Sequence, residues 1–229
     1  MSLLAAAVAA GGDPAMQLTV ASGGSSAVKL FLLLTVLSFA SAALMSITSF
    51  TRVIIVLSFL RQGLGTPTVP PNQVLIGLAL AITCFVMAPT ATRVYAGALQ
   101  PYFDDKIAPG EAIDRASVPV REFLLKQTRG EDLRLFYEAS GALRPAKAEE
   151  IPLTICVPAF MISELTTAFR MGLFVYLPLL FVDLLVSSVL MSLGMAMIPP
   201  ALVALPLKLG IFLLADGWHT IVASLLRSF

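Results

Sequence analysis

Among the few charged residues in the largely apolar C-terminal third of the chain, four stand out: Glu164, Arg170, Asp183 and Lys208. A charge at the centre of a bilayer costs at least about 2.5 kcal/mol, so these side chains are expected to face protein or water and to pair. The two acids could relay protons in a transporter. The alternative is structural ion pairs between helices or subunits, with Asp183 and Lys208 as natural partners across a helical hairpin. We favour the structural role, because no histidine or third acid lies nearby to continue a relay.

Methionines gather at a break in the uncharged stretch between these groups. Residues 184–207 are 24 residues without a charge, and a helix needs roughly 20 apolar residues to cross a bilayer. An uninterrupted spanning helix would nevertheless avoid Gly194 and the pair Pro199–Pro200. Three methionines surround this break, namely Met191, Met195 and Met197. Irregular backbone at membrane depth is tolerated where it is buried in protein or lines a water-filled cavity. The methionines therefore predict either ordinary packing or a deformable seal around a pore.

No catalytic or metal-binding pattern accompanies these residues. The chain contains no phosphate-binding loop, no G-x-S-x-G elbow and no H-E-x-x-H motif. Its one histidine, His219, excludes a histidine-based triad or metal cluster within one chain. Cys84 and Cys156 lie in apolar runs without a neighbouring histidine or second cysteine, which is typical of small buried hydrophobic residues. We therefore expect neither an enzyme nor a metal or cofactor site.

The composition predicts a membrane protein. Apolar residues make up 58% of the chain and charged residues 13%, with a mean hydropathy of +0.90, whereas soluble domains carry about 25% charged residues. The net charge of +1 provides no basic excess to hold phosphates, which argues against a nucleic-acid partner.

The distribution of charge predicts an all-α fold with two hydrophobic helical hairpins. Residues 1–28 form a tail that is either a cleaved signal peptide, since Ala7-Val8-Ala9 fits a cleavage site, or a retained segment, since a basic n-region is missing. We expect the first hairpin at 29–92, a helical periplasmic segment at 93–150 and the second hairpin, with the methionine-rich loop, at 151–229. About four spans follow, near 30–51, 73–92, from Met171 onward and 201–223, with bends at Pro178 and Pro206. The loop from Arg52 to Pro71 has two arginines and no acid, which the positive-inside rule places in the cytoplasm.

The segment 93–150 has helical patterns of its own. Glu122 and Lys126 are predicted to form an i,i+4 pair. Thr128 and Glu131 match a capping box that would start a second helix, which Gly141 would end. Two interpretations stay open, a solvated pair of helices folded over its neighbours and, slightly preferred, a surface that contacts a partner.

Several long strings resemble the FliP family of flagellar type III export-gate proteins and their injectisome counterparts. They are TSFTRVIIVLSFLRQGLGT at 48–66, PPNQVLIGLAL at 70–80, PAFMISELTTAFRMG at 158–172, VLMSLGMAMIPP at 189–200 and LPLKLGIFLLADGW at 205–218. The resemblance covers the chain from about residue 30 to Phe229, apart from part of 93–150. Because the strings are long and rare, the match is highly specific, and it favours a flagellar over a virulence system.

The resemblance implies a protein that is neither an enzyme nor a carrier. Members of the family form a homo-oligomeric, helical, ring-like export gate with FliQ and FliR, alongside FlhB and FlhA, in the bacterial inner membrane. Unfolded flagellar subunits pass through its channel. A methionine-rich loop narrows that channel as a gasket, and the matching positions here are Met195, Ala196 and Met197, with Met191 one turn upstream. Many relatives have three consecutive methionines, so Ala196 predicts a looser seal.

The resemblance also implies that the hairpins are raised out of the bilayer plane in the assembled state. Glu164, Arg170, Asp183 and Lys208 then become candidates for pairs between subunits. Two other functions remain to be distinguished. One is a small proton-coupled transporter using Asp183 and Glu164, which predicts a pH-dependent flux from the chain alone. The other is a scaffold whose hairpins only anchor other subunits, which predicts no effect of changes in the methionine loop.

Overall fold

The computed structural model describes residues 28–35, 38, 45–66, 68–141, 145, 150–195 and 197–229. The chain divides into two compact units, Met1–Leu44 and Met45–Phe229. In the first unit, residues 28–35 are helical. The predicted signal peptide lies outside the described residues, as do several positions of the predicted span 30–51.

The described residues of the second unit contain helices and no strand, in agreement with the predicted all-α class. The elements are α2 (Phe50–Gly63), α3 (Asn72–Val94), the π-helix η1 (Tyr95–Leu99), α4 (Gln100–Phe103), α5 (Pro109–Gln127), α6 (Gly130–Ser140), α7 (Leu153–Ser192), α8 (Pro200–Leu214) and α9 (Gly217–Arg227).

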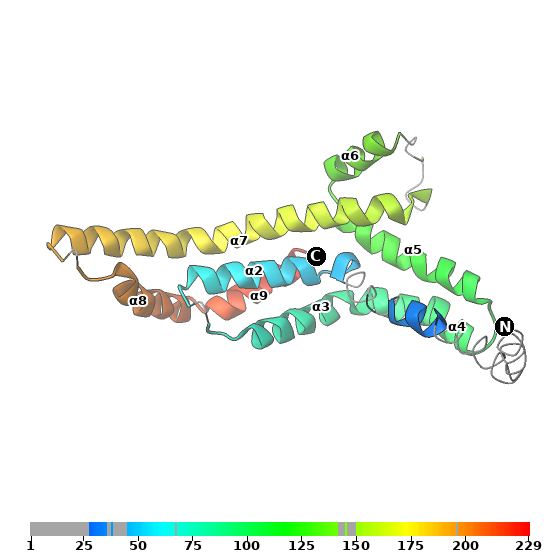
Figure 1. Cartoon of the computed structure of the whole chain (residues 1–229), viewed down its shortest axis with the longest axis horizontal. Helices are drawn as coiled ribbons and strands as arrows, with labels where there is room; N and C mark the ends of the chain where they lie inside the picture. The colour runs from blue at the N-terminus through cyan, green and yellow to red at the C-terminus, as the bar shows by residue number, and fades with distance from the viewer. Residues whose placement is uncertain are drawn as a thin grey trace, which may run out of the picture. The chain divides into compact units, whose positions relative to one another are not determined.

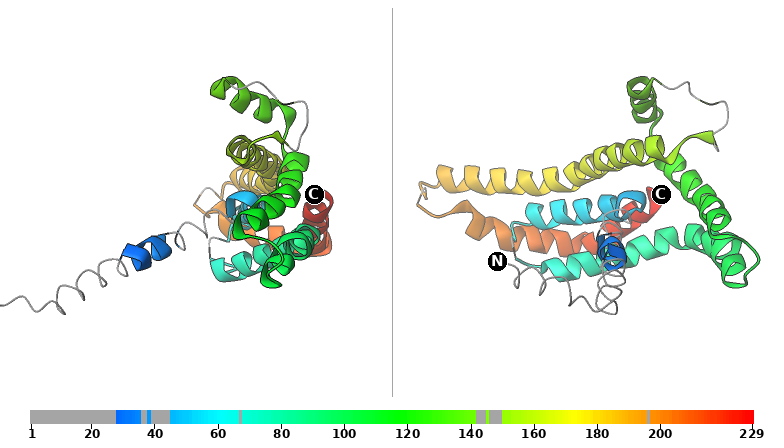
Figure 2. Two further views of the ribbon diagram at one scale, coloured as in Figure 1. Left: turned by 90° about the vertical axis from the view of Figure 1, so that its right-hand side faces the viewer. Right: turned by 45° about the vertical axis from the view of Figure 1, so that its right-hand side comes forward.

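The long helix α7 organises this unit. Helix α2 packs along it and lies between α7 and α3, while α5 and α6 meet its N-terminal half and α8 its C-terminal half (Figures 1 and 2). The predicted span from Met171 onward is part of a longer continuous helix that includes Pro178. Its 40 residues correspond to about 60 Å at 1.5 Å per residue, about twice the thickness of the hydrocarbon core of a bilayer.

Two helical stretches among the described residues are long and apolar enough to cross a membrane, Asn72–Phe103 and Leu153–Ser192. A third is possible if α8 and α9 form one broken span, since these helices meet at an angle of 62°. The predicted span 201–223 therefore contains a sharp bend between two helices. The bend falls not at Pro206, through which α8 continues, but at Asp216, whose φ is 47°. The next residue must be glycine, because a Cβ on Gly217 would lie 2.1 Å from the ring of Phe212.

Two main hydrophobic cores hold the helices together. The larger joins α2, α3, α7 and α9 around fully buried residues that include Val53, Leu57, Leu60, Ala79 and Leu225. The second joins α5 and α6 to the start of α7, and it includes Leu124, Leu133, Cys156 and Phe160. Cys156 is thus buried as predicted, whereas Cys84 is exposed on α3.

The local predictions for segment 93–150 have mixed outcomes. Gly141 ends α6 in the left-handed conformation, with a φ of 64°, as predicted. The capping box is wrong: the N-cap of α6 is Arg129, and the hydroxyl of Thr128 donates instead to the carbonyl of Leu124 at 2.7 Å. A hydroxyl that bonds back to the preceding turn closes α5 rather than opening α6.

The predicted pair between Glu122 and Lys126 is also wrong. Glu122 binds Arg93 of α3 at 2.6 Å, and Lys126 donates to the carbonyl of Phe229 at 2.9 Å. Both side chains find partners on other elements, and those contacts replace an i,i+4 pair that contributes only about 0.2–0.5 kcal/mol.

Candidate functional site

The break at the end of α7 is a defined helix cap. Gly194 has a φ of 73°, and its amide donates to the carbonyl of Met191 at 3.1 Å. The amide of Met195 reaches the carbonyl of Leu190 at 2.9 Å. This pair of hydrogen bonds around a left-handed glycine is the Schellman motif. Helix α8 then starts at Pro200, where a missing N–H costs nothing. The local sequence therefore makes a tight hairpin tip here.

The methionines of this tip are left uncovered by their own chain. The exposed fractions are 73% for Met191, 43% for Met195 and 97% for Met197. Ala196 lies outside the described residues. Below the tip, a small core of Val186, Leu190 and Ala204 holds α7 against α8. The tip is thus a supported hairpin end that presents flexible apolar side chains outward.

The structure brings Asp183 and Lys208 together across this hairpin. The ammonium group of Lys208 lies 2.6 Å from the carboxylate of Asp183 and 2.8 Å from the carbonyl oxygen of Gly63. Gly63 is the last residue of α2, so the cation also meets the negative end of a helix dipole. Lys208 is buried and Asp183 is partly exposed. One buried lysine thereby joins α7, α8 and α2.

Glu164 has a partner that the charge pattern does not predict. Glu164 and Arg52 are both buried and form a two-bond ion pair, in which Nε of Arg52 lies 2.9 Å from Oε2 of Glu164 and Nη2 binds Oε1. Arg52 also donates to the carbonyl of Ser228 at 2.7 Å, and its guanidinium carbon lies 3.9 Å from the ring centroid of Phe229. Buried charges persist when they are paired and hydrogen-bonded in this way. Arg52 therefore ties α2 to α7 and to the segment after α9.

The prediction of a loop from Arg52 onward is wrong, because residues 50–63 form α2. A signal for the helix is present in the sequence, since Val53, Val56, Leu57 and Leu60 follow helical spacing. The same spacing puts Arg52 on one face with Val56 and Leu60, at i, i+4 and i+8. An arginine on the apolar face of a helix indicates a buried acid as its partner.

A second polar network lies one residue before Glu164. The buried hydroxyl of Ser163 donates to Asp132 at 2.5 Å, and Arg129 holds both oxygens of that carboxylate at 2.8 and 3.0 Å. This network joins α6 to α7. Arg170, by contrast, is exposed and has no ion-pair partner within the described part of the chain.

The arrangement of acids favours fixed ion pairs over proton transfer. Glu164 and Asp183 are 19 positions apart on one helix, which corresponds to about 28 Å of rise, and each is bonded to its own cation. Among the described residues no group of three His, Cys, Asp or Glu side chains is arranged to hold a metal ion. On α5, the hydrogen bond from Arg93 holds the pKa of the exposed Glu122 carboxyl below its usual range.

The sequence matches the model of the FliP family over residues 33–225. The chain belongs to the FliP family. It is 52% identical over 205 residues to the flagellar biosynthetic protein FliP of Bacillus subtilis (strain 168), an alignment that covers 90% of this chain and 93% of the relative. The protein of the same name from Pectobacterium carotovorum subsp. carotovorum is 51% identical over 211 residues, covering 91% and 82%. That from Aquifex aeolicus (strain VF5) is 44% identical over 219 residues, covering 94% and 92%.

Family membership and the membrane-length helices lead to one coarse conclusion. This FliP-family chain is a membrane-associated protein of flagellar biosynthesis. The transporter hypothesis is not favoured, because neither the relatives nor the separated, paired acids support it.

Proposed function

We propose that the chain is a core subunit of the flagellar type III export gate in the bacterial inner membrane. In this proposal several copies assemble with FliQ and FliR, next to FlhB and FlhA, around a channel for unfolded flagellar subunits. The role is structural rather than catalytic. Its site is the methionine tip, with Met191, Met195, Ala196 and Met197 as the gasket.

The observation that carries the proposal is the exposure of Met191 and Met197 at a supported hairpin end. Exposed apolar side chains of this size indicate a surface that meets other molecules. Tips from several subunits that converge on an axis would form a ring of soft, unbranched side chains. Such a ring can close the empty channel or seal around a passing polypeptide, because the methionine side chain adapts to many shapes.

The length of α7 supports the assembled state. A helix of about 60 Å cannot lie wholly within a hydrocarbon core of about 30 Å unless it is strongly tilted. Only 11% of its most apolar 18-residue window is buried within the chain. Large apolar side chains are exposed along its C-terminal half, among them Phe174, Leu177, Phe181, Leu184 and Val189. Neighbouring subunits are therefore the natural cover for the part of α7 that lies outside the lipid.

The ion pairs fit a subunit that keeps its shape in such an assembly. Arg52–Glu164 and Asp183–Lys208 fasten α7 to α2 and α8 within one chain. Of the four charged residues predicted to pair, Arg170 is exposed and is therefore available for a contact between subunits.

The test is the double variant Met195→Ala, Met197→Ala in the complex co-expressed with FliQ and FliR. The matched control is Met161→Ala, which removes an exposed methionine at a distant position of α7. We expect faster leakage of a small encapsulated solute from liposomes that hold the double variant, and no change for the control. Native mass spectrometry should show the same multi-copy complex for all three proteins.

Unchanged leakage in the double variant would count against the gasket and favour the scaffold. A lone monomer or dimer in the presence of both partners would count against the export gate itself.

A further inference from the structure

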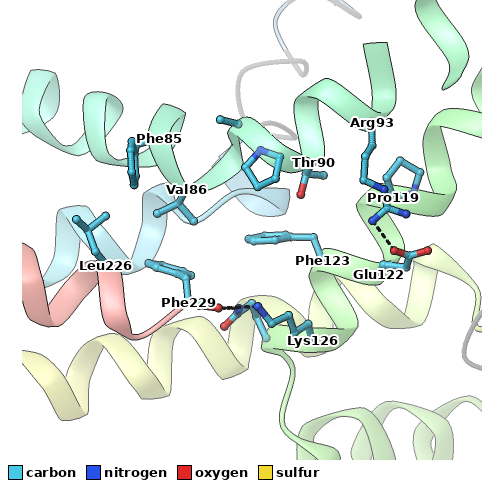
Figure 3. A pocket seen from close by; sticks show the side chains of 13 residues that line it. Phe85, Val86, Thr90, Arg93, Pro119, Glu122, Phe123, Lys126, Leu226 and Phe229 are labelled. Atoms are coloured by element: carbon cyan, nitrogen blue, oxygen red, sulfur yellow. Dashed lines mark hydrogen bonds and ion pairs between the residues drawn. The ribbon is translucent and has the colours of Figure 1, made fainter. Parts of the chain in front are cut away.

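A cavity of about 660 Å³ lies between α3, α5 and the end of α9 (Figure 3). Its volume falls within the range of ligand pockets, about 300–1,000 Å³. The methionine tip does not contribute to this cavity, whereas Gln127 and Phe229 of its lining also contact Arg52 of the buried ion pair.

The lining of the cavity changes from apolar to charged along its length. Figure 3 shows Phe85, Val86 and Leu226 on one side and Arg93 with Glu122 on the other, with Lys126 near Phe229 on the lower edge. The apolar walls could hold a hydrocarbon chain, and the charged end could hold a polar group. A phospholipid has the same polarity gradient.

The position of the cavity in the chain matches the edge of a membrane. Arg93 is the first charge after the uncharged residues 62–92; it lies one residue before the end of α3 (Asn72–Val94), within the candidate span Asn72–Phe103. Long cationic side chains at the end of a span reach toward the headgroup layer. The charged end of the cavity would therefore lie at headgroup level and its apolar end at the level of the acyl chains.

The charges favour an anionic over a zwitterionic lipid. The charged side chains of the lining are two cations, Arg93 and Lys126, and one acid, Glu122, and Phe229 contributes a main-chain oxygen beside Lys126. Arg93 is paired with Glu122 at 2.6 Å. The exposed ammonium of Lys126 makes one hydrogen bond to Phe229, although a lysine carries three N–H donors. Basic pockets between membrane helices recognise anionic headgroups in this way.

We propose that this cavity binds one anionic phospholipid, with an acyl chain against Phe85 and Leu226 and its phosphate at Lys126 and Arg93. The proposal goes beyond the export function, since it assigns a lipid site to a part of the subunit distinct from the methionine tip. It requires only the chain and a membrane, and so it can fail or succeed independently of the gasket.

The chain offers a direct reporter, because Trp218 is its only tryptophan. Trp218→Phe with Phe85→Trp places the single fluorophore in the lining of the cavity. The full chain is reconstituted in phosphatidylcholine vesicles that contain either phosphatidylglycerol or phosphatidylcholine with brominated acyl chains, and quenching is measured against bromolipid content. One lysine near an anionic headgroup contributes about 1 kcal/mol, so we expect about fivefold stronger apparent binding of phosphatidylglycerol.

Lys126→Gln in this background should bring the ratio of the two lipids close to one. The control is Arg115→Gln, which removes one positive charge from an exposed position of the same helix, outside the cavity, and should leave the ratio unchanged. Ala88→Phe fills the cavity from α3 and should weaken quenching by both lipids. Ala81→Phe, at an exposed alanine of α3 that does not line the cavity, should not.

Three results would overturn the proposal. Equal quenching by both lipids would mean ordinary contact with the bilayer. No quenching by either would mean that protein covers the cavity. An equal effect of Lys126→Gln and Arg115→Gln would mean a general charge effect rather than a site.

Discussion

Replacing Arg52 with methionine leaves the buried carboxylate of Glu164 without a hydrogen-bond donor among the described residues. Removing one partner of a buried pair costs about 3–5 kcal/mol, because the remaining charge stays desolvated. Glu164→Met is expected to cost less. Arg52 would keep the carbonyl of Ser228 at 2.7 Å and the amide oxygen of Gln127 at 3.3 Å.

The double variant Arg52→Met, Glu164→Met separates the energy of the ion pair from that of the other contacts of Arg52. Replacing a buried ion pair with apolar residues of similar volume is often neutral or stabilising, but the hydrogen bonds from Arg52 to Ser228 are lost, at about 1 kcal/mol each. We therefore expect the double variant to cost about 1–2 kcal/mol, less than Arg52→Met alone. The coupling energy between the two positions should be at least about 2 kcal/mol.

The assay is unfolding of the purified chain by sodium dodecyl sulfate in mild detergent, followed by circular dichroism. The fluorescence of Trp218, whose ring centroid is 5.5 Å from that of Phe212, reports separately on the junction of α8 and α9. The control is Arg115→Met, which breaks an exposed pair with Glu111 and should cost no more than about 0.5 kcal/mol. A double variant that costs as much as the sum of the two single variants would contradict the coupling between Arg52 and Glu164.

Two further predictions concern the tip of the hairpin and the charged end of the cavity. Gly194→Ala should destabilise the tip by about 1 kcal/mol, since φ is 73° there. The control Gly77→Ala, inside α3 with open space around it, should stabilise the chain slightly. Unfolding by sodium dodecyl sulfate compares the two variants. The pKa of Glu122 is lowered from 4.5 by Arg93, so its ionised form stabilises the fold above pH 4.5 and this contribution is lost as the pH falls through the lowered value. The midpoint of thermal unfolding of the native chain should therefore exceed that of Glu122→Gln at neutral pH and converge with it in acid, and a constant difference at all pH values would contradict the pairing.

Short-range signals predict the local features of this chain well. Gly194 ends α7 and Gly141 ends α6, because a left-handed residue without a Cβ penalty stops a helix wherever it occurs. Pro200 starts α8 for the same local reason, a preset φ and no N–H to satisfy. These effects depend only on residues within one or two helical turns, and those residues can be read directly from the sequence.

Predictions that require a choice of partner fail more often. Thr128 bonds backward to Leu124 instead of capping α6, and Glu122 binds Arg93 instead of Lys126. In each case two partners of similar strength compete, and the packing of α5 against α3 and α7 decides between them. Asn72 is a similar case, since its side-chain oxygen accepts a hydrogen bond from Arg61 and α3 begins there without a side-chain cap.

The sequence by itself determined the membrane class, the helical content, the broken hairpin and its methionines, because each follows from composition or from contacts within a few residues. It also favoured a structural role for the embedded charges over a proton relay, since isolated charges are costly in an apolar chain. Only the tertiary structure decided the partners of Arg52, which is 112 positions from Glu164 and 176 from Ser228. Local energies cannot select among such distant partners. The packing of α2 between α7 and α3 selects them, because it removes those groups from water together.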